Sequence, residues 1–193
     1  MDKPNLYIIA GCNGSGKTTA SYTILPEILK CEEFINADEI ARGLSPFHPE
    51  KSAIQAGKLM LRKIDDAIHA KKDFAFETTL ATKTHNFVIK SAQSKRYLVT
   101  LVFFWLESTE LAIQRVKNRV SEGGHNIPSD VISRRYERGL KNFFEVYEPM
   151  VNEWIFIDNS QIDYQILAKK DLNQSIEIKN DSIWTKIKKQ YER

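Results

Sequence analysis

The sequence contains little cysteine and no long hydrophobic run. Its 193 residues include only two cysteines, Cys12 and Cys31, so we expect neither a disulfide framework nor a cysteine metal site, and a reducing cytoplasm fits this composition. The longest apolar stretch, residues 97–106, is about half as long as the roughly 20 residues that a membrane-spanning helix needs. The run at residues 6–10 is too short for a secretory signal. We therefore expect a cytoplasmic protein without a membrane anchor.

A strong excess of one charge is also lacking. The chain has 28 Lys and Arg residues against 25 Asp and Glu residues, a formal net charge of +3. Several basic residues gather near its end, namely Lys179, Lys186, Lys188, Lys189 and Arg193. We interpret them as a solvated helix face, because nucleic-acid-binding proteins usually concentrate a larger positive charge on one surface. Nucleic acid is therefore not an expected partner.

The pattern of apolar residues predicts an α/β fold. Apolar runs alternate with segments of helical periodicity, and successive apolar positions are typical of strands that are covered on both faces. The expected strands are residues 6–10, 34–36, 74–77, 97–105 and 154–158. The expected helices are residues 17–25, 50–71, 84–95, 109–121 and 130–148. This order predicts a parallel five-stranded sheet sandwiched by helices.

The last part of the chain departs from this alternation. Residues 165–180 carry two short alternating runs, which predict a small hairpin, and a final helix would contain Trp184 and Ile187. We found no repeat and no low-complexity linker. The expectation is one domain over residues 1–193, with a C-terminal appendage at about 161–193.

The most informative motif is GCNGSGKT at residues 11–18, which we call the glycine loop. It matches the G-x-x-x-x-G-K-[ST] pattern of a phosphate-binding loop (Walker A), and it lies between an expected strand and an expected helix, as that pattern requires. Glycines allow the backbone N–H groups to point inward around an anion, and the helix N-terminus adds partial positive charge. The alternative is a glycine turn that carries a lysine by chance.

The residue types in and around the glycine loop suit ATP and Mg²⁺. Lys17 is expected to reach the β- and γ-phosphates, and the Thr18 hydroxyl is expected to ligate Mg²⁺. The predicted nucleotide-binding residues are Gly11, Asn13, Gly14, Ser15, Gly16, Lys17, Thr18, Thr19, Arg115 and Asn159. Cys12 receives no redox role, because a small residue with a backbone N–H suffices at this position.

Other classes of phosphate-binding-loop proteins lack support. The Asn-Lys-x-Asp motif of GTPases and the Leu-Ser-Gly-Gly signature of ABC-type ATPases are both absent from the sequence. A small kinase remains, and such enzymes place an acceptor-holding carboxylate after the second strand. Asp38 occupies this position and is the proposed base for an acceptor hydroxyl, with Asn36 and Arg42 as polar neighbours on the acceptor side. Alternatively, Asp38 is the N-cap of a helix that starts at Glu39.

Two carboxylates compete for the role of the acid near Mg²⁺. Glu77 ends the third apolar run, and with Thr79 it could also bind the acceptor, whereas Asp158 ends the fifth run. We favour Glu77 for the metal. Asp158 and the following Asn159 are assigned to the adenine side or to a turn, because nucleotide kinases keep a base-binding loop after the fifth strand.

An arginine-rich stretch at about residues 115–139 predicts a helical lid. Arg115 and Arg119 lie four residues apart, so they share one helix face, and Arg134 and Arg135 follow on the next helix. Arginines that close over the γ-phosphate neutralise charge during transfer, and a lid excludes water. The alternative is a solvated basic helix pair. His125, in the connecting loop, is a further candidate contact to a phosphate or sugar.

These blocks together resemble the zeta-toxin-like P-loop kinases, in particular a short branch known as predicted ATPases. GCNGSGKTT (11–19), FINADEIARGLSP (34–46), FAFETTL (74–80) and the arginine-rich block occur in the same order, and the resemblance covers residues 5 to 160 approximately. It implies an ATP-dependent phosphotransferase with a nucleotide-kinase-like or shikimate-kinase-like fold. It also implies UDP-N-acetylglucosamine as an acceptor and a small antitoxin as a protein partner.

The resemblance also implies roles for individual residues. The family's phosphate-binding lysine falls on Lys17 and its catalytic aspartate on Asp38. The acid and the threonine after the third strand fall on Glu77 and Thr79. The lid arginines fall on Arg119 and on either Arg134 or Arg135. One departure concerns the acceptor, because Asn36 replaces the first acid of the family's Asp-x-Asp segment.

The sequence thus predicts a Mg-ATP-dependent kinase whose acceptor is a small molecule. Two alternatives remain open. The first is a metabolic kinase of a nucleoside, sugar or alcohol, and the second is an ATP-binding toxin or regulator that acts by docking a protein partner.

Overall fold

Five apolar runs form the parallel centre of the sheet. They are β1 (Asn5–Gly11), β2 (Phe34–Ile35), β3 (Phe74–Thr78), β4 (Leu98–Trp105) and β5 (Glu153–Asp158). The computed structural model describes residues 3–124 and 126–191, so His125 and Arg193 lie outside the described residues. The strands are arranged in the order β2-β3-β1-β4-β5, and each pairs in parallel with its neighbour. All their carboxyl ends therefore meet at one edge of the sheet.

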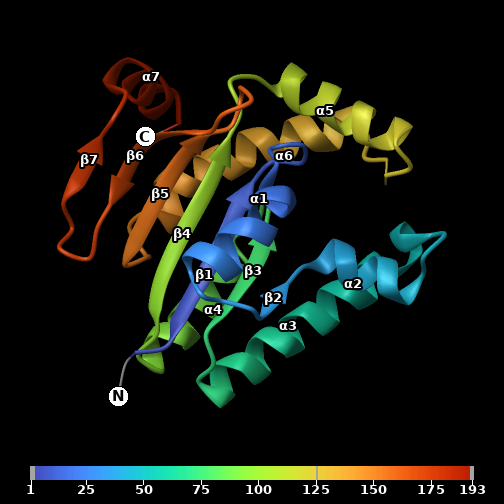
Figure 1. Ribbon diagram of the computed structural model, residues 1–193, viewed down its shortest axis with the longest axis horizontal. Helices are drawn as coiled ribbons and strands as arrows, with labels where there is room; N and C mark the ends of the chain where they lie inside the picture. Colours follow the sequence, from blue (N-terminus) through green and yellow to red (C-terminus); the bar gives the residue numbers. More distant parts are fainter. Residues whose placement is uncertain (1–2, 125, 192–193) are drawn as a thin grey trace.

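The helices cover the two faces of the sheet unequally. One face packs against α3 (Ala53–Ala70), α4 (His85–Ser94), α5 (Thr109–Ser121), α6 (Ser129–Asn142) and α7 (Asp181–Tyr191). The other face packs against α1 (Lys17–Thr23) and the π-helical turn η1 (Ile24–Ile28). Figure 1 shows α1 in front of the strands and α4 and α6 behind them. Neighbouring residues such as Ile8 and Ile9 are both buried, as expected for a strand with two covered faces.

The remaining short elements lie between or after these helices. Helix α2 (Ala37–Leu44) and the 3₁₀ turn η2 (Pro49–Ser52) precede α3, and the π-helical turn η3 (Phe143–Tyr147) follows α6. None of the described helices combines the length and the hydrophobicity that a membrane crossing requires.

The prediction of a five-stranded parallel sheet is wrong in the number of strands. The C-terminal hairpin, β6 (Gln165–Lys170) and β7 (Ile176–Ile178), extends the same sheet in antiparallel fashion, so the sheet has seven strands. Without β6, the edge of β5 would carry unpaired backbone N–H and C=O groups. Pairing with β6 gives these groups hydrogen-bond partners. Leu167 and Ala168 of β6 are completely buried. Strand β6 is therefore part of the core.

The buried face of α3 includes only some of its large aliphatic side chains. Ile64 and Ile68 are buried, whereas Ile54 is 79% exposed and Leu61 is 42% exposed. The buried face runs instead through smaller or more flexible side chains, of which Met60 is the largest. Helix α3 also packs against α2.

A cluster of aromatic rings joins α7 to the sheet. The Trp184 ring stacks on Trp154 at a centroid distance of 5.3 Å and also contacts Phe144 and Phe156. Trp184 is only 4% exposed. Aromatic pairs of this kind stabilise a core by more than their buried area alone.

We predict that Trp184→Ala lowers the free energy of unfolding by about 3–5 kcal/mol, because it leaves a large cavity between α7 and the sheet. Urea denaturation followed by circular dichroism measures the change. Phe47→Ala is the control, because Phe47 is 91% exposed, and it should change the free energy of unfolding by less than about 0.5 kcal/mol. Equal effects of the two substitutions would show that α7 is not part of the folding unit.

Candidate nucleotide and acceptor site

The glycine loop connects the carboxyl end of β1 to the first turn of α1. Gly14 and Gly16 have φ angles of 82° and 84°, in the left-handed region that favours glycine. A Cβ atom at Gly14 would lie 2.6 Å from the carbonyl oxygen of Ala112 in α5, and one at Gly16 would collide with the side chain of Asn159. The motif glycines thus allow neighbouring elements to approach the loop closely.

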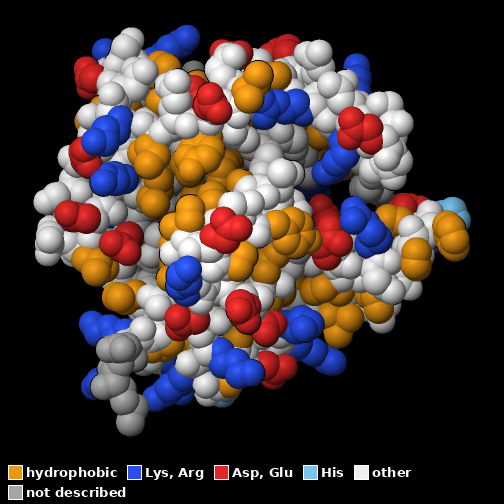
Figure 2. Space-filling model, viewed as in Figure 1, with side chains coloured by type: hydrophobic (Ala, Val, Ile, Leu, Met, Phe, Trp, Pro, Cys, Tyr) orange, Lys and Arg blue, Asp and Glu red, His pale blue; other side chains and the backbone are white. Residues whose placement is uncertain are grey.

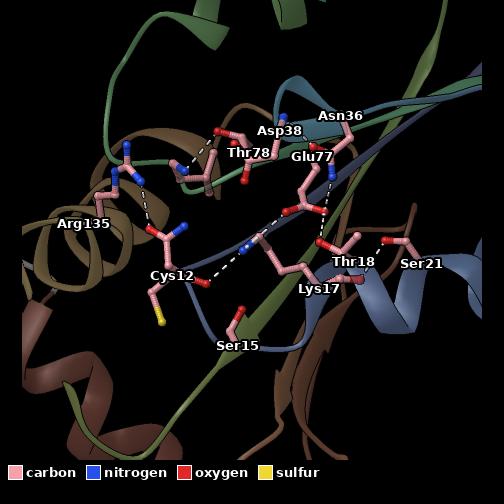
Figure 3. A network of polar contacts seen from close by, with 12 residues as sticks. Cys12, Ser15, Lys17, Thr18, Ser21, Asn36, Asp38, Glu77, Thr78 and Arg135 are labelled. Carbon is pink, nitrogen blue, oxygen red and sulfur yellow. Dashed lines mark hydrogen bonds and ion pairs between the residues drawn. The ribbon is translucent and has the colours of Figure 1, made fainter. Parts of the chain in front are cut away.

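Glu77 at the end of β3 is the centre of the polar network in this region (Figure 3). Its Oε2 accepts hydrogen bonds from Thr18 Oγ1 at 2.7 Å and from Asn36 Nδ2 at 2.9 Å. Its Oε1 lies 3.6 Å from Lys17 Nζ, and Lys17 is only 5% exposed. Lys17 Nζ also donates to the carbonyl oxygen of Cys12 at 2.8 Å. The lysine is thereby folded back over the glycine loop.

Asn36 sets the position of Asp38. Asn36 is the N-cap of α2, and its Oδ1 accepts hydrogen bonds from the backbone N–H groups of Asp38 at 2.8 Å and Glu39 at 3.3 Å. The alternative interpretation of Asp38 as an N-cap is therefore wrong, because Asp38 lies in the first turn of the helix. The asparagine that replaces an acid in the family pattern bridges α2 to Glu77.

Two clefts meet at this network. The larger one, about 470 Å³, runs from the glycine loop to α5 and includes Thr19, Arg42, Arg115 and Arg119 in its lining. The smaller one, about 240 Å³, lies between α2 and the loop that follows β3 and includes Thr79 and Arg135. Both clefts are lined by Asn13, Asn36, Asp38 and Glu77. A group bound in one cleft would therefore lie next to a group bound in the other.

The two adjacent arginines of α6 have different surroundings. Arg135 donates a hydrogen bond from Nη1 to Asn13 Oδ1 in the glycine loop at 2.9 Å. Arg134 forms an ion pair with Asp130, one helical turn earlier, at 3.7 Å and is 51% exposed. Figure 3 shows Arg135 directed toward the glycine loop. Of the pair, Arg135 is the one that could reach a phosphate on the loop.

The arginines of α5 lie on the far side of the larger cleft. The Arg115 guanidinium donates to the carbonyl oxygens of Asn159 at 2.8 Å and Ser160 at 2.9 Å, so it ties α5 to the loop after β5. Asn159 in turn donates from Nδ2 to the carbonyl oxygen of Ser15 at 2.8 Å. Arg119 lines the cleft one turn after Arg115.

Asp158 has a structural role in its turn. Its Oδ1 accepts a hydrogen bond from the backbone N–H of Ser160 at 2.8 Å, and the Ser160 hydroxyl binds the same oxygen. Asp158 lines neither cleft of the site. Of the two acids considered for a metal, Glu77 is the one beside Thr18.

The thiol of Cys12 is buried in the glycine loop. Its side chain is 5% exposed, and burial raises the pKa of Cys12 to about 11. The thiol therefore stays protonated at neutral pH, and only the thiolate is a good nucleophile.

The loop after β3 contains residues that the motifs did not indicate. Leu80 has a φ of 52°, and its carbonyl oxygen accepts a hydrogen bond from Asn142 Nδ2 at 2.6 Å. The Tyr147 hydroxyl donates to the carbonyl oxygen of Thr82 at 2.6 Å. Thr82 and His85 both line the smaller cleft. The one sequence signal for Thr82 and His85 is their position shortly after β3, the strand that carries Glu77.

The donors near the glycine loop fit Mg²⁺. Thr18 and Glu77 offer a hydroxyl and a carboxylate 2.7 Å apart, and Mg²⁺ prefers such oxygen ligands. No cluster of three His, Cys, Asp or Glu side chains suited to a metal occurs in the described part of the chain. This donor set fits a Mg²⁺ ion that depends on phosphate oxygens and water for most of its ligands.

Comparison with known proteins reveals several relatives. An uncharacterised protein of Haemophilus influenzae is 30% identical over 126 residues, which are 65% of this chain and 88% of that protein. The structure of AvrRxo1-ORF1:-ORF2 with ATP matches with a TM-score of 0.76 and 16% identity, over 96% of this chain. A structure from the PezAT chromosomal toxin–antitoxin system of Streptococcus pneumoniae matches with a TM-score of 0.66 and 15% identity, over 94% of this chain and 77% of that one.

The structural matches share only 15–16% of their residues with this chain, so they show a similar fold and nothing beyond it. The chain spans only 63% of the length of the AvrRxo1 chain that it matches. Stronger evidence comes from a family model, described as zeta toxin, that matches residues 1–168. This segment includes the glycine loop, Asp38, Glu77 and both arginine-bearing helices. The chain therefore belongs to the zeta toxin family.

Proposed function

We propose that this protein is a Mg-ATP-dependent phosphotransferase that moves the γ-phosphate of ATP to a hydroxyl group of a small molecule. The observation that carries the proposal is the meeting of two clefts at Asp38 and Glu77, beside Lys17 of the glycine loop. A kinase needs this arrangement, because its two substrates must be held in line at one carboxylate.

The larger cleft is the proposed nucleotide site. The N–H groups of the glycine loop and Lys17 would bind the β- and γ-phosphates, and Thr18 with Glu77 would hold Mg²⁺. Bound there, Mg²⁺ supplies positive charge to the phosphate oxygens. Arg115 and Asn159, which already connect α5 to the glycine loop, would form the wall on the adenine side.

The smaller cleft is the proposed acceptor site. Asp38 would accept the proton of the acceptor hydroxyl. The hydroxyl oxygen would then bond to the γ-phosphorus as the bond from that phosphorus to ADP breaks and ADP leaves. Arg119 and Arg135, on opposite helices of the lid, would neutralise the charge of the transferring group. Following the family, we propose a nucleotide sugar such as UDP-N-acetylglucosamine as acceptor, with Asn36, Glu77 and Thr79 on the acceptor side. Arg42, which was expected there, lines the larger cleft instead.

Two alternatives have specific support. The smaller cleft, at about 240 Å³, is below the usual range of about 300–1,000 Å³ for ligand sites, which favours a metabolic kinase of a small sugar or alcohol. A nucleotide-binding toxin or regulator that acts through a protein partner is the other alternative. It is supported by two similar structures, which come from the AvrRxo1-ORF1:-ORF2 complex and from a toxin–antitoxin system. An antitoxin is therefore a proposed partner.

We predict that the protein transfers labelled phosphate from ATP to UDP-N-acetylglucosamine and that Lys17→Ala and Asp38→Ala each lower kcat by about 10³-fold or more. Thin-layer chromatography of the products measures the transfer. Thermal unfolding of each variant is the control for folding. Wild-type turnover by Asp38→Ala would exclude Asp38 as the base. Faster labelling of a free sugar than of UDP-N-acetylglucosamine would support the metabolic alternative.

The neighbours Arg134 and Arg135 form a matched pair for a second prediction. Arg135→Ala should lower kcat by about 10²- to 10³-fold, because it removes a positive charge from the transferring phosphoryl group. Arg134→Ala should change kcat by less than twofold, because its partner is Asp130 on the surface. The same transfer assay measures both, and equal losses would contradict the assignment of Arg135.

A third prediction concerns Mg²⁺. Glu77→Gln removes the negative charge beside Thr18 but keeps a side chain of similar size, so binding of a fluorescent ATP analogue should require a higher Mg²⁺ concentration. A titration of Mg²⁺ at fixed nucleotide measures the shift, with Asp158→Asn as the control that should leave it unchanged. An identical Mg²⁺ dependence of Glu77→Gln and wild type would exclude Glu77 from the metal site.

A further inference from the structure

The smaller cleft contains a histidine that the proposed mechanism does not use. His85 is the first residue of α4 and lines the cleft together with Asp38, Thr79 and Arg135. Its ring packs on Phe76 of β3, with a centroid distance of 4.9 Å and an interplanar angle of 40°. The side chain therefore lies where an acceptor would bind.

The backbone around His85 is held firmly. The Tyr147 hydroxyl donates a hydrogen bond to the carbonyl oxygen of Thr82, three residues before His85, at 2.6 Å. Tyr147 and Phe76 are both completely buried. Because one buried residue fixes the backbone and another supports the ring, the imidazole has a defined orientation before any ligand binds.

The two ring nitrogens of His85 differ in their surroundings. Nδ1 is buried and has no hydrogen-bond partner in the described part of the chain. Burial lowers the pKa of His85 to about 4, so the ring is neutral at pH 7 and carries one N–H. A buried N–H without a partner costs about 1–3 kcal/mol, so the proton is expected on Nε2, which leaves a donor for the cleft.

The charges around the cleft disfavour an anionic group at this position. Asp38 and Glu77 contribute two carboxylates to the lining, against the one guanidinium of Arg135, which the proposed mechanism assigns to the transferring phosphoryl group. Thr79 and Thr82 add polar groups without charge. With a volume of about 240 Å³, the cleft suits a single ring better than a whole nucleotide.

We propose that His85 is a specificity-determining residue that donates a hydrogen bond from Nε2–H to an uncharged oxygen of a sugar ring, either a hydroxyl or an amide carbonyl. This inference rests on the proposed function, because it takes the smaller cleft as the acceptor site. It assigns the sugar of a nucleotide sugar to this cleft and leaves the nucleotide portion outside it.

The test compares two substitutions of His85 in the transfer assay with UDP-N-acetylglucosamine. His85→Phe keeps an aromatic ring on Phe76 but removes the donor, so the KM for the acceptor should rise about five- to tenfold, as expected for one hydrogen bond. His85→Gln returns an N–H donor and should recover most of the loss. The KM for ATP and the melting temperature should stay at the wild-type values. His69→Phe is the control, because His69 lies on the exposed side of α3.

Two results would overturn the inference. One is an unchanged acceptor KM in His85→Phe, and the other is a parallel rise of both KM values with a lower melting temperature, which indicates a purely structural role. Binding of gluconate that is tighter than binding of N-acetylglucosamine would overturn the assignment of an uncharged ring.

The design separates this inference from the proposed function. If the wild-type protein binds a fluorescent ATP analogue but transfers no phosphate, the role of His85 is tested by calorimetric titration of the wild type and of His85→Phe with N-acetylglucosamine. Weaker binding to His85→Phe than to wild type supports the inference, and equal or absent binding overturns it. A wild-type protein that does not bind the ATP analogue contradicts the proposed function itself.

Discussion

The site depends on the carboxylate of Glu77. This one group at the end of β3 contacts Thr18 and Lys17 of the glycine loop and the N-cap residue of α2. A charge that is only 11% exposed is costly unless it is paired and hydrogen-bonded, and these three contacts satisfy it. The position of the glycine loop and the start of α2 are thereby tied to each other through β3, and Asp38 is placed one residue inside α2.

Helix α6 links the two clefts from the opposite side. Arg135 contacts the glycine loop, while Gly139, one turn later, packs so closely that a Cβ atom would lie 2.6 Å from the carbonyl oxygen of Thr79. Asn142 at the end of the helix binds the carbonyl oxygen of Leu80. A shift of α6 would therefore move a phosphate-side arginine and the acceptor-side loop together. The lid stays a prediction, and under it closure over the nucleotide would also shape the acceptor cleft.

The sequence predicted those parts of the molecule that depend on local patterns. The glycine loop has a fixed spacing, and the five apolar runs identified the parallel strands and the residues after them, including Glu77 and Asp38. Other features depend on packing between distant segments. The pairing of β6 with β5 follows from a free sheet edge, and the choice between Arg134 and Arg135 depends on the rotation of α6. The role of His85 depends on the fold of a loop with a left-handed Leu80.

The most direct test of the account is a crystal structure of the protein with Mg²⁺ and a non-hydrolysable ATP analogue. In the present structure Lys17 Nζ donates to the carbonyl oxygen of Cys12 at 2.8 Å. The account predicts that Lys17 leaves this oxygen for the β- and γ-phosphates, and that the γ-phosphate lies where the two clefts meet, beside Asp38 and Arg135. Electron density for the nucleotide outside the larger cleft, or a Lys17 that remains on Cys12 with nucleotide bound, would contradict it.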